Sequence, residues 1–233
     1  MTDERNIAAA MRGGHRSTAA ARGVDQRRPV GSGSSPLRCH RVVVLGEFNS
    51  GKTTLVNALV GAPVLHPSAI THTSHPTVVA FRTKPSLSAE TVDRKRTLVT
   101  WDDLDAAPRN DVRRLHVGAP LARLQHLAVV DTPGFGLDDW ESERASLRAC
   151  RNADTVIWCT PAIQAWKASE ERTWLALPKR VRAGGILAVT FADAIASQAD
   201  VERLLQRLTA EAGPYFQKVV LAEQCAALVV ALA

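Results

Sequence analysis

The segment from Gly46 to Thr53 limits what this chain can fold into more than any other part of its sequence. It reads Gly-Glu-Phe-Asn-Ser-Gly-Lys-Thr and so fits the phosphate-loop pattern of Gly, four residues and Gly-Lys-Thr. An apolar run at residues 41–45 precedes it, and a candidate helix at 54–60 follows it. Strand, loop and helix therefore come in the order that a phosphate-binding loop requires.

The residue types of this segment suit contact with a nucleotide. Gly46 allows a tight turn out of the strand, and Gly51 lets the backbone pass close to phosphate oxygens. Lys52 brings a mobile positive charge to the outer phosphates, and the Thr53 hydroxyl is a ligand type for Mg²⁺. The nucleotide-binding residues predicted from this segment are Gly46, Asn49, Ser50, Gly51, Lys52, Thr53 and Thr54.

Short apolar runs and helical stretches alternate along the rest of the chain. This pattern predicts an α/β fold with a doubly wound, mostly parallel sheet and helices on both faces. The predicted strands are 41–45, 77–82, 98–101, 114–117, 127–130, 155–159, 186–190 and 218–221, and the helices are 54–60, 141–151, 167–177 and 200–212.

Two parts of the middle region are harder to interpret. Residues 83–110 are charged and contain two prolines, so we predict an excursion with 98–101 as its one short strand. Residues 114–117 and 127–130 are predicted to form a strand pair that leads to Asp131. Ligands in such folds bind at the carboxyl ends of the strands. The phosphate loop, Asp131, Thr160 and Thr190 all follow strand ends, so we expect them along one edge.

The first 36 residues are rich in Ala, Arg, Gly and Ser and contain six of the 29 basic residues but only three of the 23 acidic ones. This composition predicts a disordered tail, with a single domain over 37–233. Half of the net charge of +6 lies on the tail. Nucleic acid or an acidic membrane could bind it, but we favour a solvated leader or a mis-assigned start. We expect no nucleic-acid partner.

The tail has no secretory signal, and the chain has no run of 18 apolar residues. The four cysteines, at 39, 150, 159 and 225, lack metal-ligand spacing, so we predict reduced thiols and a cytoplasmic location. Peripheral attachment to a membrane stays open. For the histidines at 66, 72 and 75 we favour solvated side chains over a Zn²⁺ site.

A second nucleotide-linked segment closes the strand at 127–130. It reads Asp131-Thr132-Pro133-Gly134. The Asp131 carboxylate can hold Mg²⁺ through its hydration shell, and the Gly134 N–H can reach a terminal phosphate. In combination with the upstream phosphate loop, this segment is a specific sign of a nucleotide-hydrolysing protein.

Three stretches of this sequence resemble the translation-factor-like class of GTPases and, more narrowly, the bacterial dynamin-like proteins. They are residues 46–61, the run from Asp131 to Phe135, and residues 70–77. The resemblance implies that Thr73 is a second Mg²⁺ ligand that closes over the γ-phosphate. Thr71 and Thr77 are alternatives, and the third stretch could also be a polar hinge loop.

The same resemblance implies that residues 190–193 select guanine. Thr190 and Asp193 match the expected pattern, and the Asp193 carboxylate can accept hydrogen bonds that adenine does not offer. Phe191 stands where the family has Lys; a phenyl ring can still cover the base but lacks the ammonium. Residues 219–224 replace the family's final Ser-Ala signal, which is missing.

Two residues bear on hydrolysis. Phe135 stands where Ras-like proteins have a water-orienting Gln, and the resemblance implies that dimerisation across the nucleotide completes such sites. Asn49 matches an Asn of GTPases that recruit K⁺, although a loop-stabilising role is equally open. Residues 160–170 are similar to a loop that contacts a partner, whereas Trp166 could equally be ordinary packing.

We therefore predict an enzyme that hydrolyses GTP to GDP and phosphate with Mg²⁺, and for which K⁺ is an open second cofactor. Lys52, Thr73 and Gly134 are the predicted catalytic residues, and Thr53, Thr73 and Asp131 the metal ligands. One alternative is a GTP-binding switch or assembly module with little hydrolysis. Another is an ATPase, if Asp193 does not read the base. The apolar end at 224–233 predicts a G domain that is truncated. Self-association is expected, and a membrane or helical partner is not identified.

Overall fold

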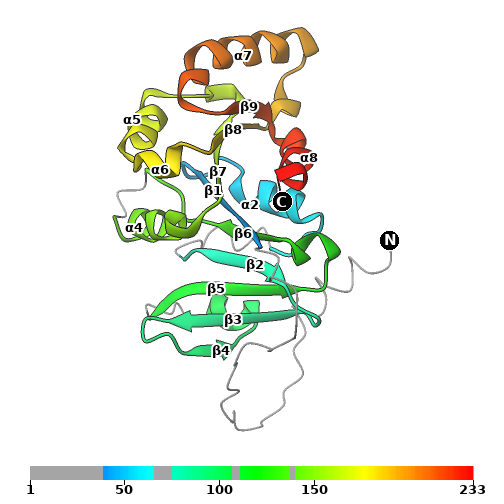
Figure 1. Cartoon of the computed structure of the whole chain (residues 1–233), viewed down its shortest axis with the longest axis vertical. Helices are drawn as coiled ribbons and strands as arrows, with labels where there is room; N and C mark the ends of the chain where they lie inside the picture. The colour runs from blue at the N-terminus through cyan, green and yellow to red at the C-terminus, as the bar shows by residue number, and fades with distance from the viewer. Residues whose placement is uncertain (1–38, 66–74, 107–110, 137–139, 233) are drawn as a thin grey trace, which may run out of the picture.

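The computed structural model describes residues 39–65, 75–106, 111–136 and 140–232. They form a nine-stranded sheet in the order β4-β3-β5-β2-β6-β1-β7-β8-β9 (Figure 1). The strands are β1 His40–Gly46, β2 Thr77–Phe81, β3 Ser86–Thr91, β4 Arg96–Leu98, β5 Val112–Ala119, β6 Leu127–Asp131, β7 Thr155–Pro161, β8 Gly185–Thr190 and β9 Lys218–Leu221.

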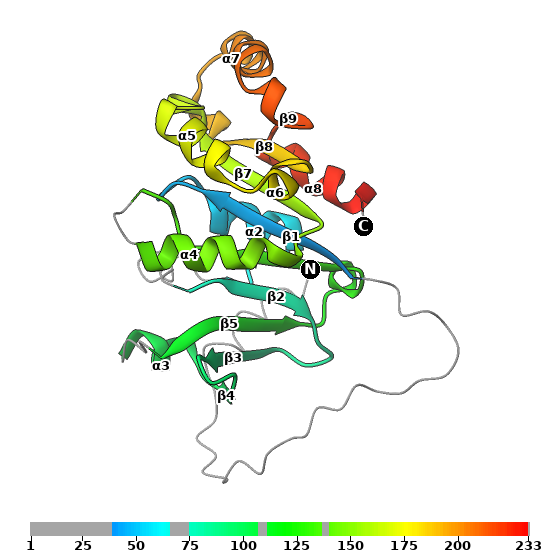
Figure 2. The ribbon, with the colours of Figure 1, turned by 60° about the vertical axis from the view of Figure 1, so that its left-hand side comes forward.

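Helices cover both faces of the sheet. Because side chains alternate along a strand, Val42 and Val44 of β1 join one apolar core and Val43 and Leu45 join the other. The first core includes α2, α3 and α8, and the second includes α4, α5, α6 and α7 (Figures 1 and 2). These helices are α2 Lys52–Val60, α3 Trp101–Ala106, α4 Trp140–Ala149, α5 Ala168–Ala176, α6 Lys179–Arg182, α7 Gln198–Glu211 and α8 Ala222–Leu232.

The sheet is mostly parallel, as predicted. β1 pairs in parallel with both β6 and β7, and β8 lies parallel to β7 and β9. Antiparallel pairing is confined to one side, where β2 meets β6 and where β3 meets β4 and β5. The carboxyl ends of β1, β6, β7 and β8 consequently lie along one edge, which is where the predicted site residues follow the strands.

The region between β2 and β6 differs from its prediction. The expected excursion at 83–110 contains an antiparallel hairpin of β3 and β4, and the strand predicted at 98–101 is wrong because Trp101 begins α3. The strand pair predicted from 114–117 and 127–130 is also wrong. β2 lies between β5 and β6, and it hydrogen-bonds to both.

The last segment is a helix and not a loose apolar end. α8 follows β9 directly, and its Cys225 and Val229 are buried in the core that α2 also joins. All four cysteines are free thiols, and three of them are buried. The predicted tail at 1–36 and Thr73 lie outside the described residues. In the described part of the chain no helix is long and apolar enough to cross a membrane.

Candidate nucleotide site

The phosphate loop crosses from β1 to α2 at the carboxyl edge of the sheet. Gly46 has φ +150°, and a Cβ there would lie 2.6 Å from the carbonyl oxygen of Cys159, so no other residue fits. Gly51 has φ +81° and stands at the start of α2. Asn49 adopts φ +57°, a left-handed conformation that Asn tolerates. The structure thus gives Asn49 a role in shaping the loop, and a contact with K⁺ stays a prediction.

Lys52 is buried within this loop. Its ammonium donates a 2.6 Å hydrogen bond to the carbonyl oxygen of Glu47, which belongs to the loop itself. Burial lowers the pKa of Lys52, while the nearby Asp131 opposes that shift. Within the described residues this neutral carbonyl is the one hydrogen-bond acceptor of the ammonium, which is therefore well placed for a stronger, anionic acceptor.

Asp131, at the end of β6, faces the first turn of α2. The Thr53 hydroxyl donates to Asp131 Oδ2 at 2.7 Å, whereas Asp131 Oδ1 is buried and has no hydrogen-bond partner among the described residues. Burial is the largest influence on this group and raises its pKa to about 6. One hydroxyl and one half-satisfied carboxylate side by side are the donor set that Mg²⁺ accepts in nucleotide sites, so these residues fit the predicted metal.

The segment after Asp131 packs directly onto the phosphate loop. Phe135 donates its N–H to the carbonyl oxygen of Gly46 at 3.1 Å and accepts a hydrogen bond from the Phe48 N–H at 3.1 Å. A Cβ on Gly134 would lie 2.8 Å from Phe48 Cα, so the backbone approach requires glycine. Gly134 therefore lies against the loop that is predicted to hold the phosphates.

The Phe135 side chain turns inward. It is 3% exposed and stacks on Trp158 with a ring-centroid distance of 5.6 Å. Phe135 consequently cannot orient a water molecule, as its apolar chemistry predicts.

Thr190 and Ser50 lie in the interior of the carboxyl edge of the sheet, where Thr190 connects neighbouring backbone segments. The Thr190 hydroxyl lies 2.9 Å from the carbonyl oxygen of Ser50 and 3.2 Å from that of Thr160, so it links the phosphate loop to two strand ends. Ser50 Oγ is buried and has no partner among the described residues. Direct contact of these two side chains with a nucleotide stays a prediction.

The predicted base-reading segment lies at the same edge. Phe191 has φ +55° and is 44% exposed, and its ring atoms lie 3.2 Å from where a Cβ on Gly51 would be. Asp193 is exposed on the short helix Ala192–Ala194. The ring thus covers the start of α2, and the carboxylate is free to meet a ligand from solvent.

Several residues of this edge were missed by the sequence analysis. Glu47 of the loop accepts a 2.6 Å hydrogen bond from the Ser169 hydroxyl and pairs with the Lys167 ammonium at 2.5 Å. Both partners lie in the segment that was predicted to contact another protein, and here they fix the loop to the start of α5. Only their chain position, just after a strand end, was a signal in the sequence.

Trp166, in that same segment, is a packing residue. It is 8% exposed and contacts Phe216 at a centroid distance of 5.1 Å. The backbone N–H of Trp166 donates to the Thr160 hydroxyl at 2.9 Å. The packing alternative is the one that the structure supports.

Other predicted residues have different placements. Thr54 is exposed on the first turn of α2, and Thr77 is buried in β2 opposite Asp131. Thr71, His66 and His72 lie outside the described residues. Among the residues that are described, no group of three His, Cys, Asp or Glu side chains could hold a metal ion.

A strand–loop–helix cradle with a buried ammonium and a half-satisfied carboxylate defines a phosphate-loop nucleotide-binding domain. The sequence profile of the dynamin family matches residues 42–182. The chain belongs to the dynamin family, and the part described here is its G domain.

Similar proteins include one that matches by sequence and one that matches by fold. The Dynamin-like protein 2 of Campylobacter jejuni is 28% identical over 135 residues, which cover 56% of this chain but 22% of that protein. A solved bacterial dynamin, from an oligomerised pair described as sensing and tethering membranes, has a TM-score of 0.58 at 18% identity; the match covers 79% of this chain and 31% of that one. This chain thus spans less than a third of each relative's length.

A more distant likeness concerns the fold alone. The structure of Era in complex with MgGDPNP and a ribosomal RNA segment has a TM-score of 0.50 at 17% identity. The match covers 84% of this chain and 56% of Era. The G-domain fold therefore extends over most of the described residues.

Proposed function

We propose that this protein binds GTP with Mg²⁺ and hydrolyses it to GDP and phosphate. The half-satisfied Asp131 beside Thr53 and Lys52 carries the proposal, because a buried carboxylate oxygen without a partner is costly unless a ligand completes it. Membership of the dynamin family makes a guanine nucleotide the expected ligand.

Each part of the edge would have a defined task. The loop amides and the Lys52 ammonium would hold the β- and γ-phosphates, and Thr53, Asp131 and the predicted Thr73 would hold the metal. Mg²⁺, when bound, supplies positive charge that offsets the charge of the phosphate oxygens. Gly134, which lies against the loop, would offer its N–H to the γ-phosphate, and Asp193 would read the base from solvent.

We also propose that a single copy of the protein hydrolyses GTP slowly and that two paired copies hydrolyse it faster. Phe135 is buried against Trp158 and so supplies no polar group for the attacking water. Three exposed apolar side chains follow the ends of β1, β7 and β8, which gives the edge a surface suited to pairing with a second copy. They are Phe48, Ile163 and Phe191, exposed by 45%, 76% and 44%. We infer that the protein is cytoplasmic and hydrolyses GTP at this edge of the sheet.

A switch or assembly module with little hydrolysis is the second candidate. The inward-turned Phe135 favours it, because the described residues offer no side chain in its place to orient water. An ATPase remains the outcome if Asp193 does not contact the base. Competition between GTP and ATP for a fluorescent nucleotide decides which base is bound.

Phosphate release from GTP tests the proposal. We would measure it with K⁺ or Na⁺ over a series of protein concentrations, for the wild type and for Lys52→Ala. Activation by pairing predicts a rate that rises faster than linearly with concentration, and Lys52→Ala should lower it by about 100-fold or more. Lys179→Ala, an exposed lysine of α6, is the matched control. An unchanged rate in Lys52→Ala would overturn the assignment, and a negligible wild-type rate with intact GTP binding would establish the module.

A further inference from the structure

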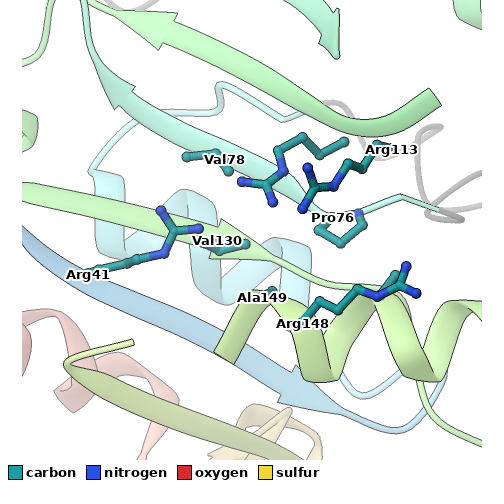
Figure 3. A pocket seen from close by; sticks show the side chains of 9 residues that line it. Arg41, Pro76, Val78, Arg113, Val130, Arg148 and Ala149 are labelled. Carbon is teal, nitrogen blue, oxygen red and sulfur yellow. The ribbon is translucent and has the colours of Figure 1, made fainter. Parts of the chain in front are cut away.

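A small pocket beside α4 is lined by arginines and by no acidic residue (Figure 3). Its volume is about 30 Å³, which suits a compact ion. None of its lining residues belongs to the phosphate loop or to the segment 131–136. The four arginines are Arg41, Arg113, Arg114 and Arg148, and the apolar floor includes Pro76, Val78 and Val130.

These arginines come from three different elements. Arg41 is the second residue of β1, Arg113 and Arg114 lie in β5, and Arg148 lies in the last turn of α4. The floor is formed where β2 and β6 pair, with Val78 opposite Val130, and α4 covers one side (Figure 3). The fold therefore gathers four positive charges from distant parts of the chain around one apolar base.

The positive charge of the pocket is poorly compensated within the described residues. Arg41 Nε is buried and has no hydrogen-bond partner there. Burial lowers the pKa of Arg41, and the charge of Arg114 lowers it further, while Asp154 opposes that shift. A buried guanidinium nitrogen without a hydrogen-bond partner is costly, so such an arrangement favours the entry of an anion.

Glu90 is an acidic partner of Arg113 and Arg114, and it is shared with other basic side chains. Its carboxylate lies 3.6 Å from Arg113 and 3.9 Å from Arg114. It also accepts a 2.8 Å hydrogen bond from His116 and lies 3.5 Å from Arg96. One carboxylate thus serves three arginines and a histidine, and Glu90 does not line the pocket.

We propose that this pocket binds a phosphate group, either as the free ion or as the phosphomonoester of a small molecule. Guanidinium groups match the oxygens of a phosphate in pairs, and several of them around one site give charge-assisted hydrogen bonds. The side chain of Arg148 is exposed, so a substituent on the phosphate could extend past it into solvent.

Titration calorimetry with inorganic phosphate and with glycerol 3-phosphate tests this inference. All proteins would carry Lys52→Ala, which weakens competing binding at the phosphate loop, and chloride would hold the ionic strength constant. Adding Arg148→Gln should weaken phosphate binding by about tenfold, since a charged hydrogen bond is lost. Arg203→Gln removes the same charge from the exposed face of α7 and should leave binding within about twofold.

The outcomes separate clearly. Binding of inorganic phosphate alone would identify the free ion, and tighter binding of glycerol 3-phosphate would identify a phosphomonoester; both support the pocket. Absence of heat from either compound on a protein with a folded circular dichroism spectrum would overturn the proposal. Equal losses in Arg148→Gln and Arg203→Gln would also overturn it. Because Arg148 is exposed, its replacement should leave the fold intact.

Discussion

Two buried carboxylates near the carboxyl edge of this sheet have opposite surroundings. Glu170, at the start of α5, is 0% exposed and has both oxygens occupied: Trp158 Nε1 donates to one at 3.0 Å, and the Thr160 hydroxyl donates to the other at 2.9 Å. The Lys167 N–H adds a third hydrogen bond at 2.9 Å. Asp131 is 2% exposed, but in the described part of the chain only one of its oxygens accepts a side-chain hydrogen bond.

The difference distinguishes a structural carboxylate from one that awaits a ligand. The three hydrogen bonds to Glu170 fix the β7–α5 connection and leave neither carboxylate oxygen without a partner. Asp131 Oδ1 has no hydrogen-bond partner among the described residues, which is costly unless a ligand completes it. Burial raises the pKa of both groups, so the pKa alone does not tell the two roles apart; the hydrogen-bond partners do.

Removing the satisfied carboxylate should have the largest effect on stability. Glu170→Ala leaves the Trp158 indole, the Thr160 hydroxyl and the Lys167 N–H without their acceptor. We expect the free energy of unfolding to fall by about 4 kcal/mol, because several buried donors lose a charged partner. Urea unfolding measures it, and the exposed Glu211→Ala on α7 is the control, with a change of about 0.5 kcal/mol or less. A loss below about 1 kcal/mol would contradict the structural role.

Removing the Asp131 carboxylate should raise the free energy of unfolding, measured without nucleotide. The pKa of Asp131 rises from 3.8 to about 6 on folding, so the folded state binds this proton more tightly. The contribution of Asp131 to the free energy of unfolding is therefore fully present below pH 3.8, and it is lost as the pH rises through 6. Asp131→Asn should be more stable than the wild type at pH 7.5 by on the order of 2 kcal/mol.

Thermal unfolding without nucleotide, measured from pH 4 to pH 8, checks the sign of this effect. The stability difference between Asp131→Asn and the wild type should grow between pH 4 and pH 7 and then remain constant. If the stability difference between the two proteins is independent of pH, the ionised Asp131 carboxylate is not destabilised by its burial.

Thr190, at the end of β8, should show the smallest effect. Its hydroxyl connects the carbonyl oxygens of Ser50 and Thr160, and Thr160 in turn donates to Glu170. Thr190→Val keeps the shape but removes this link, at a cost of about 1 kcal/mol in urea unfolding. GTP affinity should weaken only severalfold if Thr190 acts on the loop from behind. A loss of 100-fold or more would instead place its hydroxyl in contact with the nucleotide.

The sequence predicted the parts of this molecule that local patterns encode. The phosphate loop and Asp131 were predictable because glycine conformations and residue order define them, and buried strands such as β7 are continuous apolar runs. The hairpin of β3 and β4 was missed because β3 has only two buried apolar side chains among polar ones, and the exposed β4 lies at the sheet edge. α8 was missed because an evenly apolar segment has no helical period.

Partners that lie far apart in the chain were not predictable. Glu47 and Ser169 are 122 residues apart, and Glu90 and His116 meet only because β3 pairs with β5. Charge and spacing do not encode such contacts, and the same is true of the four arginines around the pocket. The distinction between Asp131 and Glu170 likewise required knowledge of which donors surround each oxygen.

GTP titration calorimetry with Mg²⁺ and with EDTA, on the wild type and Asp131→Asn, tests the central claim most directly. The claim is that the bare oxygen of Asp131 is completed by a metal-bound nucleotide. We predict that Asp131→Asn weakens binding by about 30-fold or more in Mg²⁺, since a charged contact is lost, and that the two proteins bind alike in EDTA. Equal affinities of the two proteins in Mg²⁺ would contradict the account.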